Sequence, residues 1–231
     1  MKKTRSKGVN TAAYDSSRTG VYADNIAYIY PESRVPVFTG FSAQFKRGEI
    51  VAVTGKNGCG KTTLSKLLTG MIRPSAGLIT IDGFDTAYMD LFQIGQRIGY
   101  IFQNPNRQLF CETAYSEVIY GLTNSGLDET AAGEKAERYL SLFGLARLSD
   151  VYPGKLSFGE KQRLALAAVL ALGTDYLVLD EPTSGLDIRH QRELGELLVN
   201  MRADRNCGIV FTSHEQDFID LYADRELVMA L

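Results

Sequence analysis

Cysteine, histidine and tryptophan are scarce in this chain of 231 residues, which has three cysteines, two histidines and no tryptophan. The cysteines, Cys59, Cys111 and Cys207, are odd in number, lie far apart and form no Cys-x-x-Cys pair. This pattern argues against a disulfide framework and indicates a reducing compartment. Neither His190 nor His214 stands at a spacing from these cysteines that is familiar in zinc sites, so the sequence predicts no zinc centre.

Long hydrophobic runs are also missing. The longest, residues 164–172, is about half of what a membrane-spanning helix needs. The basic N-terminus is followed by no apolar stretch, which argues against a secretory signal. The net charge of −2 is too small to indicate nucleic acid as the main partner. If the protein serves a membrane process, other chains must therefore cross the bilayer.

Residues 1–20 differ from the rest of the chain. They carry five basic side chains against one acidic side chain and almost no large apolar group. We expect a disordered arm here, either a solvated tail or a segment attracted to anionic lipid head groups. Residues 21–231 have the ordinary composition of a soluble globular domain.

A glycine-rich stretch at residues 55–63 carries the strongest chemical signal. It fits the pattern of a phosphate-binding loop: Gly, four residues, Gly, Lys, Thr. A buried strand is predicted before it, at residues 49–54, and an amphipathic helix after it, so its backbone N–H groups would face one anion at a helix N-terminus. In such a loop Lys61 reaches the β and γ phosphates of a nucleotide and Thr62 binds Mg²⁺. The predicted nucleotide-binding residues of this loop are Gly55, Lys56, Asn57, Gly58, Cys59, Gly60, Lys61, Thr62 and Thr63.

The flanking pattern predicts an α/β domain. Strands are expected at residues 26–30, 37–45, 78–83, 97–102, 176–179 and 208–213, and the apolar runs among them are typical of a buried parallel sheet. Residues 104–155 look like an α-helical insertion, with helices at 112–122 and 130–143. A further helix is expected at 161–172, begun by a capping box of Ser157 and Glu160. Tyr30 could stack on an adenine ring or simply pack in the sheet core; the sequence leaves both open.

The order of the remaining motifs identifies a family. The phosphate loop is followed by Gln103 at a strand end, Leu156-Ser157-Phe158-Gly159-Glu160 at a helix start, Asp180-Glu181-Pro182 after an apolar strand, Ser184-Gly185-Leu186-Asp187, and His214 at another strand end. This series resembles the nucleotide-binding subunits of ATP-binding cassette (ABC) proteins, from about residue 22 to residue 231. The resemblance implies a P-loop NTPase fold with a parallel-sheet RecA-like core, an antiparallel β subdomain and an α-helical subdomain.

Phosphoryl transfer needs positioning and charge stabilisation, and the residue types suit it. Asp180 would hold Mg²⁺ through water, together with Thr62, and Glu181 is the candidate base for the attacking water. The family resemblance further implies that Gln103 lies near Mg²⁺ and this water, that His214 contacts the γ-phosphate, and that Asp187 acts across a dimer interface.

The resemblance also implies a composite site. Ser157 and Gly159 of one subunit would close over the ATP held by another, so the chain needs a second ATPase, either itself or a relative. Phe158 and Glu160 depart from the commonest family pattern, which has glycine and glutamine at these positions. Because Ser157 and Gly159 are retained, we expect ATPase activity, with ATP and Mg²⁺ as substrate and cofactor.

A subtype signal follows Gln103. Residues 101–110 and 117–122 are similar to the ATPases of energy-coupling factor (ECF) transporters, which import vitamins or transition-metal ions. This implies a transmembrane coupling protein and a substrate-binding membrane protein as partners, and a peripheral location at the cytoplasmic face of the membrane. Another ABC importer or exporter, or a soluble ABC switch, stays open. Docking residues for the membrane partner are expected among a set of residues, each of which could instead simply pack the helical insertion: Leu109, Phe110, Ala114, Tyr115, Val118 and Tyr120.

Overall fold

The computed structural model describes residue 15 and residues 18–229. Residues 1–14 and 16–17, most of the expected arm, lie outside the described residues, so that expectation stays a prediction. The end of the arm is described. Arg18 forms an ion pair with Asp24 at 3.0 Å, and the Gly20 N–H donates to Asp82 at 3.0 Å. Residues 18–20 therefore pack against the antiparallel sheet.

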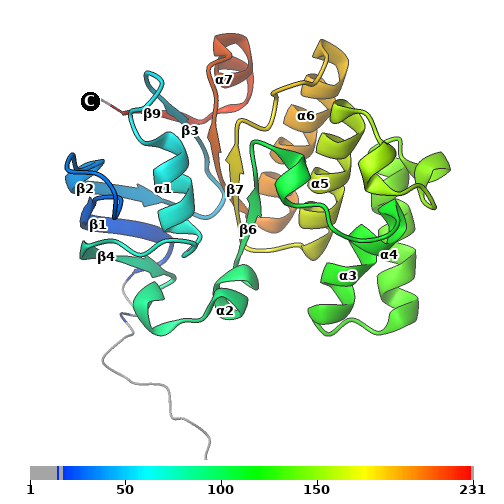
Figure 1. Ribbon diagram of the computed structural model, residues 1–231, viewed down its shortest axis with the longest axis horizontal. Helices are drawn as coiled ribbons and strands as arrows, with labels where there is room; N and C mark the ends of the chain where they lie inside the picture. Colours follow the sequence, from blue (N-terminus) through cyan, green and yellow to red (C-terminus); the bar gives the residue numbers. More distant parts are fainter. Residues whose placement is uncertain (1–14, 16–17, 230–231) are drawn as a thin grey trace, which may run out of the picture.

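A parallel sheet forms the centre of the molecule (Figure 1). Its strands lie in the order β6-β7-β8-β3-β9. Every neighbouring pair is parallel, so all the carboxyl ends meet at one edge of the sheet. Within this register Asp180 lies opposite Thr212. The strands are β3 (Ile50–Thr54), β6 (Ile98–Ile101), β7 (Tyr176–Asp180), β8 (Gly208–Thr212) and β9 (Arg225–Val228).

An antiparallel sheet stands beside it, with strand order β2-β1-β4-β5. Its members are β1 (Val21–Tyr28), β2 (Phe38–Phe45), β4 (Ala76–Ile81) and β5 (Phe84–Asp85). The first strand begins earlier than the sequence predicts, at Val21 instead of Ile26, and it ends before Tyr30. A register shift and the left-handed backbone of Asn25 interrupt the alternation of β1 in its middle.

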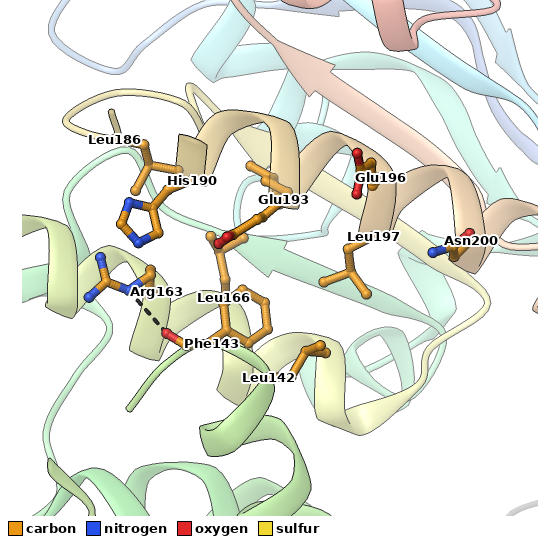
Figure 2. Close-up of a pocket in the computed structure, with 11 residues that line it drawn as sticks. Leu142, Phe143, Arg163, Leu166, Leu186, His190, Glu193, Glu196, Leu197 and Asn200 are labelled. Atoms are coloured by element: carbon orange, nitrogen blue, oxygen red, sulfur yellow. Dashed lines mark hydrogen bonds between the residues drawn. The ribbon is translucent and has the colours of Figure 1, made fainter. Parts of the chain in front are cut away.

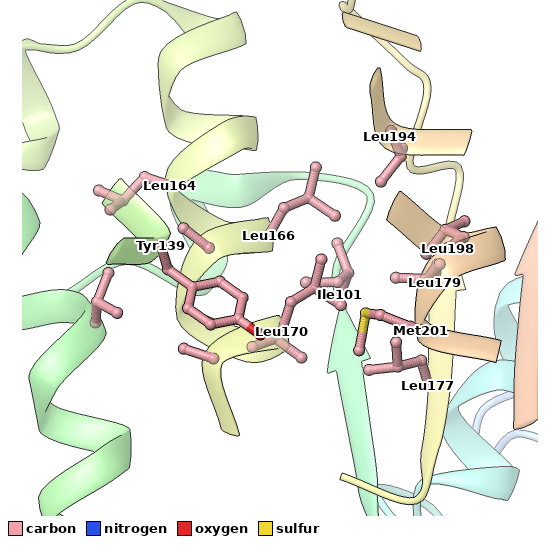
Figure 3. Close-up of a cluster of buried hydrophobic side chains, with 14 of the residues drawn as sticks. Ile101, Tyr139, Leu164, Leu166, Leu170, Leu177, Leu179, Leu194, Leu198 and Met201 are labelled. Atoms are coloured by element: carbon pink, nitrogen blue, oxygen red, sulfur yellow. The ribbon is translucent and has the colours of Figure 1, made fainter. Parts of the chain in front are cut away.

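Two apolar cores cover the two faces of the parallel sheet. Helix α1 (Lys61–Leu68) and the antiparallel sheet pack on one face, and α5 (Phe158–Leu172) and α6 (Ile188–Arg205) pack on the other (Figure 1). Leu177 and Leu179 of β7 point into the second core, among Leu166 and Leu170 of α5 (Figure 3). Successive strand residues alternate between the cores, as the two-residue period of a strand requires.

The helical insertion agrees with the sequence in its two long helices, α3 (Ala114–Asn124) and α4 (Glu129–Leu142). The structure adds the short α2 (Leu91–Gly95) and, near the C-terminus, α7 (Gln216–Tyr222). Single 3₁₀ turns also occur, at Thr86–Tyr88, Pro105–Arg107, Ala146–Leu148 and Pro153–Lys155.

The structure corrects part of the expected docking surface. Ala114 and Val118 are both 0% exposed, and they lie in the core between the helical insertion and α5. With Leu122 they form an i, i+4, i+8 series, which is the core-facing stripe of α3. Phe110 and Tyr120 are exposed, as a docking surface requires.

An arginine network joins the two sheets. The Arg47 guanidinium donates to Asp82 at 2.7 Å and to both oxygens of Asp175 at 2.9 Å, and the Tyr176 hydroxyl donates to Asp82 at 2.6 Å. Burial acts to raise the pKa of Asp82, but the hydrogen bonds from Arg47 and Tyr176 outweigh it and hold this pKa below its usual value. The network fixes how the antiparallel sheet sits against the core.

Candidate nucleotide site

The phosphate loop has the conformation that its sequence predicts. It connects β3 to α1, and Gly55, Gly58 and Gly60 all have positive φ angles, of 136°, 84° and 102°. At Gly55 an added Cβ would lie 2.5 Å from the Met229 carbonyl oxygen, and at Gly60 it would lie 2.7 Å from a Val37 methyl group. Side chains are therefore excluded by both backbone strain and space.

The loop is built to receive an anion. Helix α1 begins at Lys61 with no acidic residue in its first turn, so its N-terminal amides and partial positive charge face the loop. The Lys61 ammonium group donates to the Gly55 carbonyl at 2.8 Å and lies 3.5 Å from that of Lys56. The lysine is thus held over the loop by weak neutral acceptors, which a phosphate oxygen can replace with a charge-assisted hydrogen bond.

The acidic pair lies at the carboxyl end of β7. Asp180 is buried, and its Oδ1 accepts a hydrogen bond from the Thr212 hydroxyl at 2.8 Å. Glu181 follows with a left-handed backbone, φ 49°, and its N–H donates to the same hydroxyl at 2.8 Å. Oε1 of Glu181 lies 3.2 Å from Nε2 of His214, which follows β8. The ends of two adjacent strands therefore bring both carboxylates and the histidine together.

Burial raises the pKa of Glu181 above its usual value, while the nearby His214 and Lys61 act against this rise. A carboxylate with a raised pKa binds a proton more readily than an exposed glutamate. This is the direction that general-base chemistry requires.

One cavity of about 470 Å³ collects most of the predicted site residues. Gln103, which follows β6, completes its wall at the strand ends. The lining residues are Tyr30, Val37, Asn57, Gly58, Gly60, Lys61, Thr62, Thr63, Gln103, Asp180, Glu181 and His214. Gly55, Lys56 and Cys59 belong to the loop but do not line the cavity, and the Cys59 side chain is buried.

Tyr30 stands at the edge of this cavity and not in the sheet core. Its hydroxyl and that of Thr63 form a hydrogen bond at 3.1 Å, and its ring meets Tyr28 edge-on at 5.0 Å. This position suits contact with the adenine ring of a nucleotide. It disfavours the alternative that Tyr30 packs in the sheet core.

Three predicted residues lie elsewhere. Ser157 caps α5 and forms a capping box with Glu160, as its sequence predicts, and Gly159 follows in the first turn. Asp187 caps α6 and accepts hydrogen bonds from the His190 N–H at 2.9 Å and from its ring at 2.8 Å. None of the three lines the cavity.

The donor set at the cavity fits Mg²⁺. Thr62, Gln103 and Asp180 offer hydroxyl, amide and carboxylate oxygens, and Mg²⁺ takes hard oxygen ligands, commonly one or two carboxylates plus substrate phosphates. Within residues 15 and 18–229 no cluster of three or more histidine, cysteine, aspartate or glutamate side chains could hold a metal by itself. The fit therefore depends on a bound phosphate group.

Sequence reasoning missed two contributors to the site. Thr212 was read only as part of a buried strand, although a polar residue at a strand end two positions before His214 is a usable signal. Tyr100 of β6 was read the same way; burial and the charge of nearby Asp180 raise the pKa of its phenol. Both act through neighbours on adjacent strands, which a linear pattern does not reveal.

A second cavity, of about 320 Å³, lies between the end of α4, α5 and α6 (Figure 2). Leu142, Leu166 and Leu197 give it apolar walls, and the Arg163 Nε donates to the Phe143 carbonyl at 3.1 Å. It contains none of the predicted site residues and lacks the phosphate-binding backbone of the first cavity. The helical insertion is incompletely packed against α6 at this point.

No helix in the part of the chain that the structure describes has the length and apolar character to cross a membrane.

Comparison with known proteins agrees with this geometry. The family model described as "ABC transporter" matches residues 38–184. A putative ABC transporter ATP-binding protein of Pyrococcus furiosus is 40% identical over 203 residues, covering 88% of this chain and 77% of the relative. A protein with the same description from Methanothermobacter marburgensis is 36% identical over 212 residues, covering 91% and 76%.

Solved structures give the same result. CbiO1 of Clostridium perfringens, described as part of the ABC transporter complex cbiONQ, superposes with a TM-score of 0.79 at 34% identity, covering 91% of this chain and 84% of that chain. A dimeric ATP-binding cassette bound to ADP and Pi superposes with a TM-score of 0.83 at 23% identity and supports the fold. The chain therefore belongs to the ATP-binding proteins of ABC transporters and is an ABC ATPase.

Proposed function

We propose that this chain energises an ECF-type ABC importer for a vitamin or a transition-metal ion by binding and hydrolysing ATP. The observation that carries the proposal is that the predicted site residues fall into two separate groups. Eleven predicted residues share one cavity, while Ser157, Gly159 and Asp187 lie outside it at the starts of α5 and α6. Such a division is expected of a site that two subunits complete.

ATP binding uses the phosphate loop and Tyr30. The loop amides and the Lys61 ammonium group hold the β and γ phosphates, and Tyr30 contacts the adenine ring. His214, which also lines the cavity, contacts the γ-phosphate. Thr62, Gln103 and, through water, Asp180 would hold Mg²⁺, which would neutralise charge on the phosphates.

Hydrolysis uses Glu181. Its carboxylate accepts a proton from the attacking water, and Gln103 helps to orient this water. The 3.2 Å contact with His214 fixes the direction of the Glu181 side chain before nucleotide arrives.

Closure of the dimer completes the ATP site with residues of the second subunit. Ser157 and Gly159 of a second ATPase subunit close over the γ-phosphate, with the N-terminus of α5 directed at the anion. Asp187 contacts the partner across the interface. Hydrolysis removes the phosphate that joins the two subunits, so ATP acts as a switch for association.

A groove between α2 and α3 suits the membrane partner. Its volume is about 840 Å³, and its walls carry Leu91, Phe92 and Tyr120, which are 61%, 59% and 52% exposed. Phe110, from the segment after Gln103, stacks edge-on with Tyr120 at 5.2 Å. An apolar groove of this kind accepts a short helix from another chain, and the coupling protein of the transporter is the proposed occupant.

The ECF subtype is supported by the similarity to CbiO1 and by residues 101–110 after β6. It implies that the protein acts at the cytoplasmic face of the membrane, beneath the coupling protein and a substrate-binding membrane protein. The alternative is the ATPase of another ABC importer or exporter.

The test is purification of the tagged chain from membranes in mild detergent, followed by mass spectrometry of the intact complex. We expect a second ATPase subunit, a coupling protein and a small membrane protein. Two identical large transmembrane domains would instead support another ABC transporter, and recovery only in the soluble fraction would contradict a transport role.

A further inference from the structure

Thr212 is the last residue of β8 and is only 1% exposed. The strand register sets it opposite Asp180, at the edge where the catalytic residues gather. No role for Thr212 follows from the phosphate loop, the capped helices or the acidic pair. Its burial and its place beside Asp180 nevertheless suggest that its hydroxyl group serves the site.

The hydroxyl makes two hydrogen bonds of different kinds. It accepts from the Glu181 N–H at 2.8 Å, because an amide can only donate. Its single proton then goes to Oδ1 of Asp180, also at 2.8 Å. One buried side chain thereby connects the backbone of one acidic residue with the carboxylate of the other.

The bond to Glu181 acts at a strained position. A φ of 49° is uncommon for a residue other than glycine, and such a backbone persists only where the surroundings hold it. The turn that follows holds it from one side, through the Ser184 N–H donating to the Glu181 carbonyl at 3.1 Å. Thr212 holds it from the other.

We propose that Thr212 is a positioning residue for ATP hydrolysis, whose hydroxyl fixes the Asp180 carboxylate and the left-handed backbone of Glu181 as one unit. Loss of the hydroxyl frees the carboxylate to rotate and leaves the partly buried Glu181 N–H without this partner. The inference rests on the proposed function, because Asp180 and Glu181 are its metal-binding and base residues.

The test is Thr212→Val, which keeps the branched shape and removes both hydrogen bonds. We expect kcat to fall about 10- to 100-fold, as for loss of other partners that orient metal ligands. ATP affinity without Mg²⁺ stays unchanged, because the phosphate loop is untouched. The gain in ATP affinity on adding Mg²⁺ shrinks about tenfold, because Asp180 is no longer oriented.

Two variants separate the hydroxyl from packing. Thr212→Ser keeps the hydroxyl and retains most of the rate and of the Mg²⁺ effect. Thr80→Val makes the same chemical change in β4, at a buried hydroxyl with no hydrogen bond among the described residues, and leaves both measurements as in the wild type.

Wild-type turnover and a wild-type Mg²⁺ effect in Thr212→Val overturn the inference. Equal losses in the Val and Ser variants, with lowered melting temperatures, also overturn it, because packing would then be the cause. Glu181→Gln is measured in parallel and is expected to bind ATP but hydrolyse it at least about 100-fold more slowly. If Glu181→Gln hydrolyses ATP slowly and Thr212→Val hydrolyses it at the wild-type rate, only the inference about Thr212 is overturned. If Glu181→Gln hydrolyses ATP at the wild-type rate, Glu181 is not the base, and the inference about Thr212 is overturned with it.

Discussion

At the scale of single residues, Glu181 is subject to two opposing influences. Burial raises its pKa, and His214 and Lys61 act to lower it. Because the proposed base must be deprotonated, we expect turnover to be lost as pH falls through this pKa. The acid limb of the pH profile therefore lies above that of an ordinary glutamate.

Removing His214 removes one of the influences that lower this pKa. We expect His214→Ala to shift the acid limb of kcat/KM to higher pH, measured on the residual activity that remains without the γ-phosphate contact. His190→Ala is the control, because His190 pairs with Asp187 and does not contact Glu181. An acid limb that stays in place or moves to lower pH in His214→Ala would contradict the electrostatic role.

Local chemistry explains which residues the sequence predicts well. The phosphate loop and the Ser157–Glu160 capping box are fixed by neighbours in the chain, so their geometry follows from their residue types. Thr212 and Tyr100 act on Asp180 from neighbouring strands. No local sequence pattern predicts the strand register that brings these residues together. For Val118 the sequence leaves open whether the side chain docks a partner or packs the helical insertion, and only the structure shows that its stripe on α3 faces the core.

At the scale of elements, a substitution in the groove between α2 and α3 tests docking more specifically than substitutions at the residues that the sequence predicts. We expect Phe92→Asp to release the ATPase from its membrane partner while ATP binding survives, because a charge enters an apolar contact surface. Size-exclusion chromatography of the detergent complex measures the release. Leu221→Asp on α7, also an exposed apolar side chain, is the matched control.

Val118→Asp should behave differently from Phe92→Asp. It buries a charge in the core of the helical insertion, so it lowers the melting temperature instead of acting on docking alone.

An intact complex with Phe92→Asp would show that the groove between α2 and α3 is not the docking site.

The Arg47 network sets the stability of the contact between the two sheets. Arg47→Ala removes hydrogen bonds to Asp82 and Asp175, and we expect the free energy of unfolding to fall by about 1.5 to 3 kcal/mol, since the bonds are charge-assisted and partly shielded. Urea unfolding measures the loss. Arg189→Ala, which breaks an exposed pair with Glu193, should cost no more than about 0.5 kcal/mol. Equal losses in the two variants would contradict a special role for the network.

At the scale of the whole molecule, the proposed composite site needs two chains, because Ser157 and Gly159 lie outside the cavity that Lys61 lines. We expect the Glu181→Gln chain to form a dimer with ATP, measured by light scattering, because slow hydrolysis preserves the joining phosphate. Adding Gly159→Asp should abolish the dimer and leave ATP binding intact, because it sets a carboxylate against the partner's phosphate.

The fold can accept Gly159→Asp, since an added Cβ would lie 3.5 Å from the nearest heavy atom, the Gly185 carbonyl oxygen. A monomer of Glu181→Gln at saturating ATP would contradict self-association and indicate a related ATPase as the partner. The motif order predicted the architecture of one chain well, but it could not decide this, because the partner surface is not part of a motif.

The position of β3 also has a consequence for synthesis of the protein. Within the described residues, the strand that leads into the phosphate loop pairs with β8 and β9 alone, which follow it by about 150 to 170 residues. The Met229 N–H donates to the Thr54 carbonyl, just before the loop, at 2.9 Å. At 5 to 20 residues per second, a ribosome needs on the order of ten seconds to make the intervening chain. A nascent chain therefore carries a phosphate-loop sequence long before it has a phosphate-binding site, and ATP can stabilise the fold only after β9 has been made.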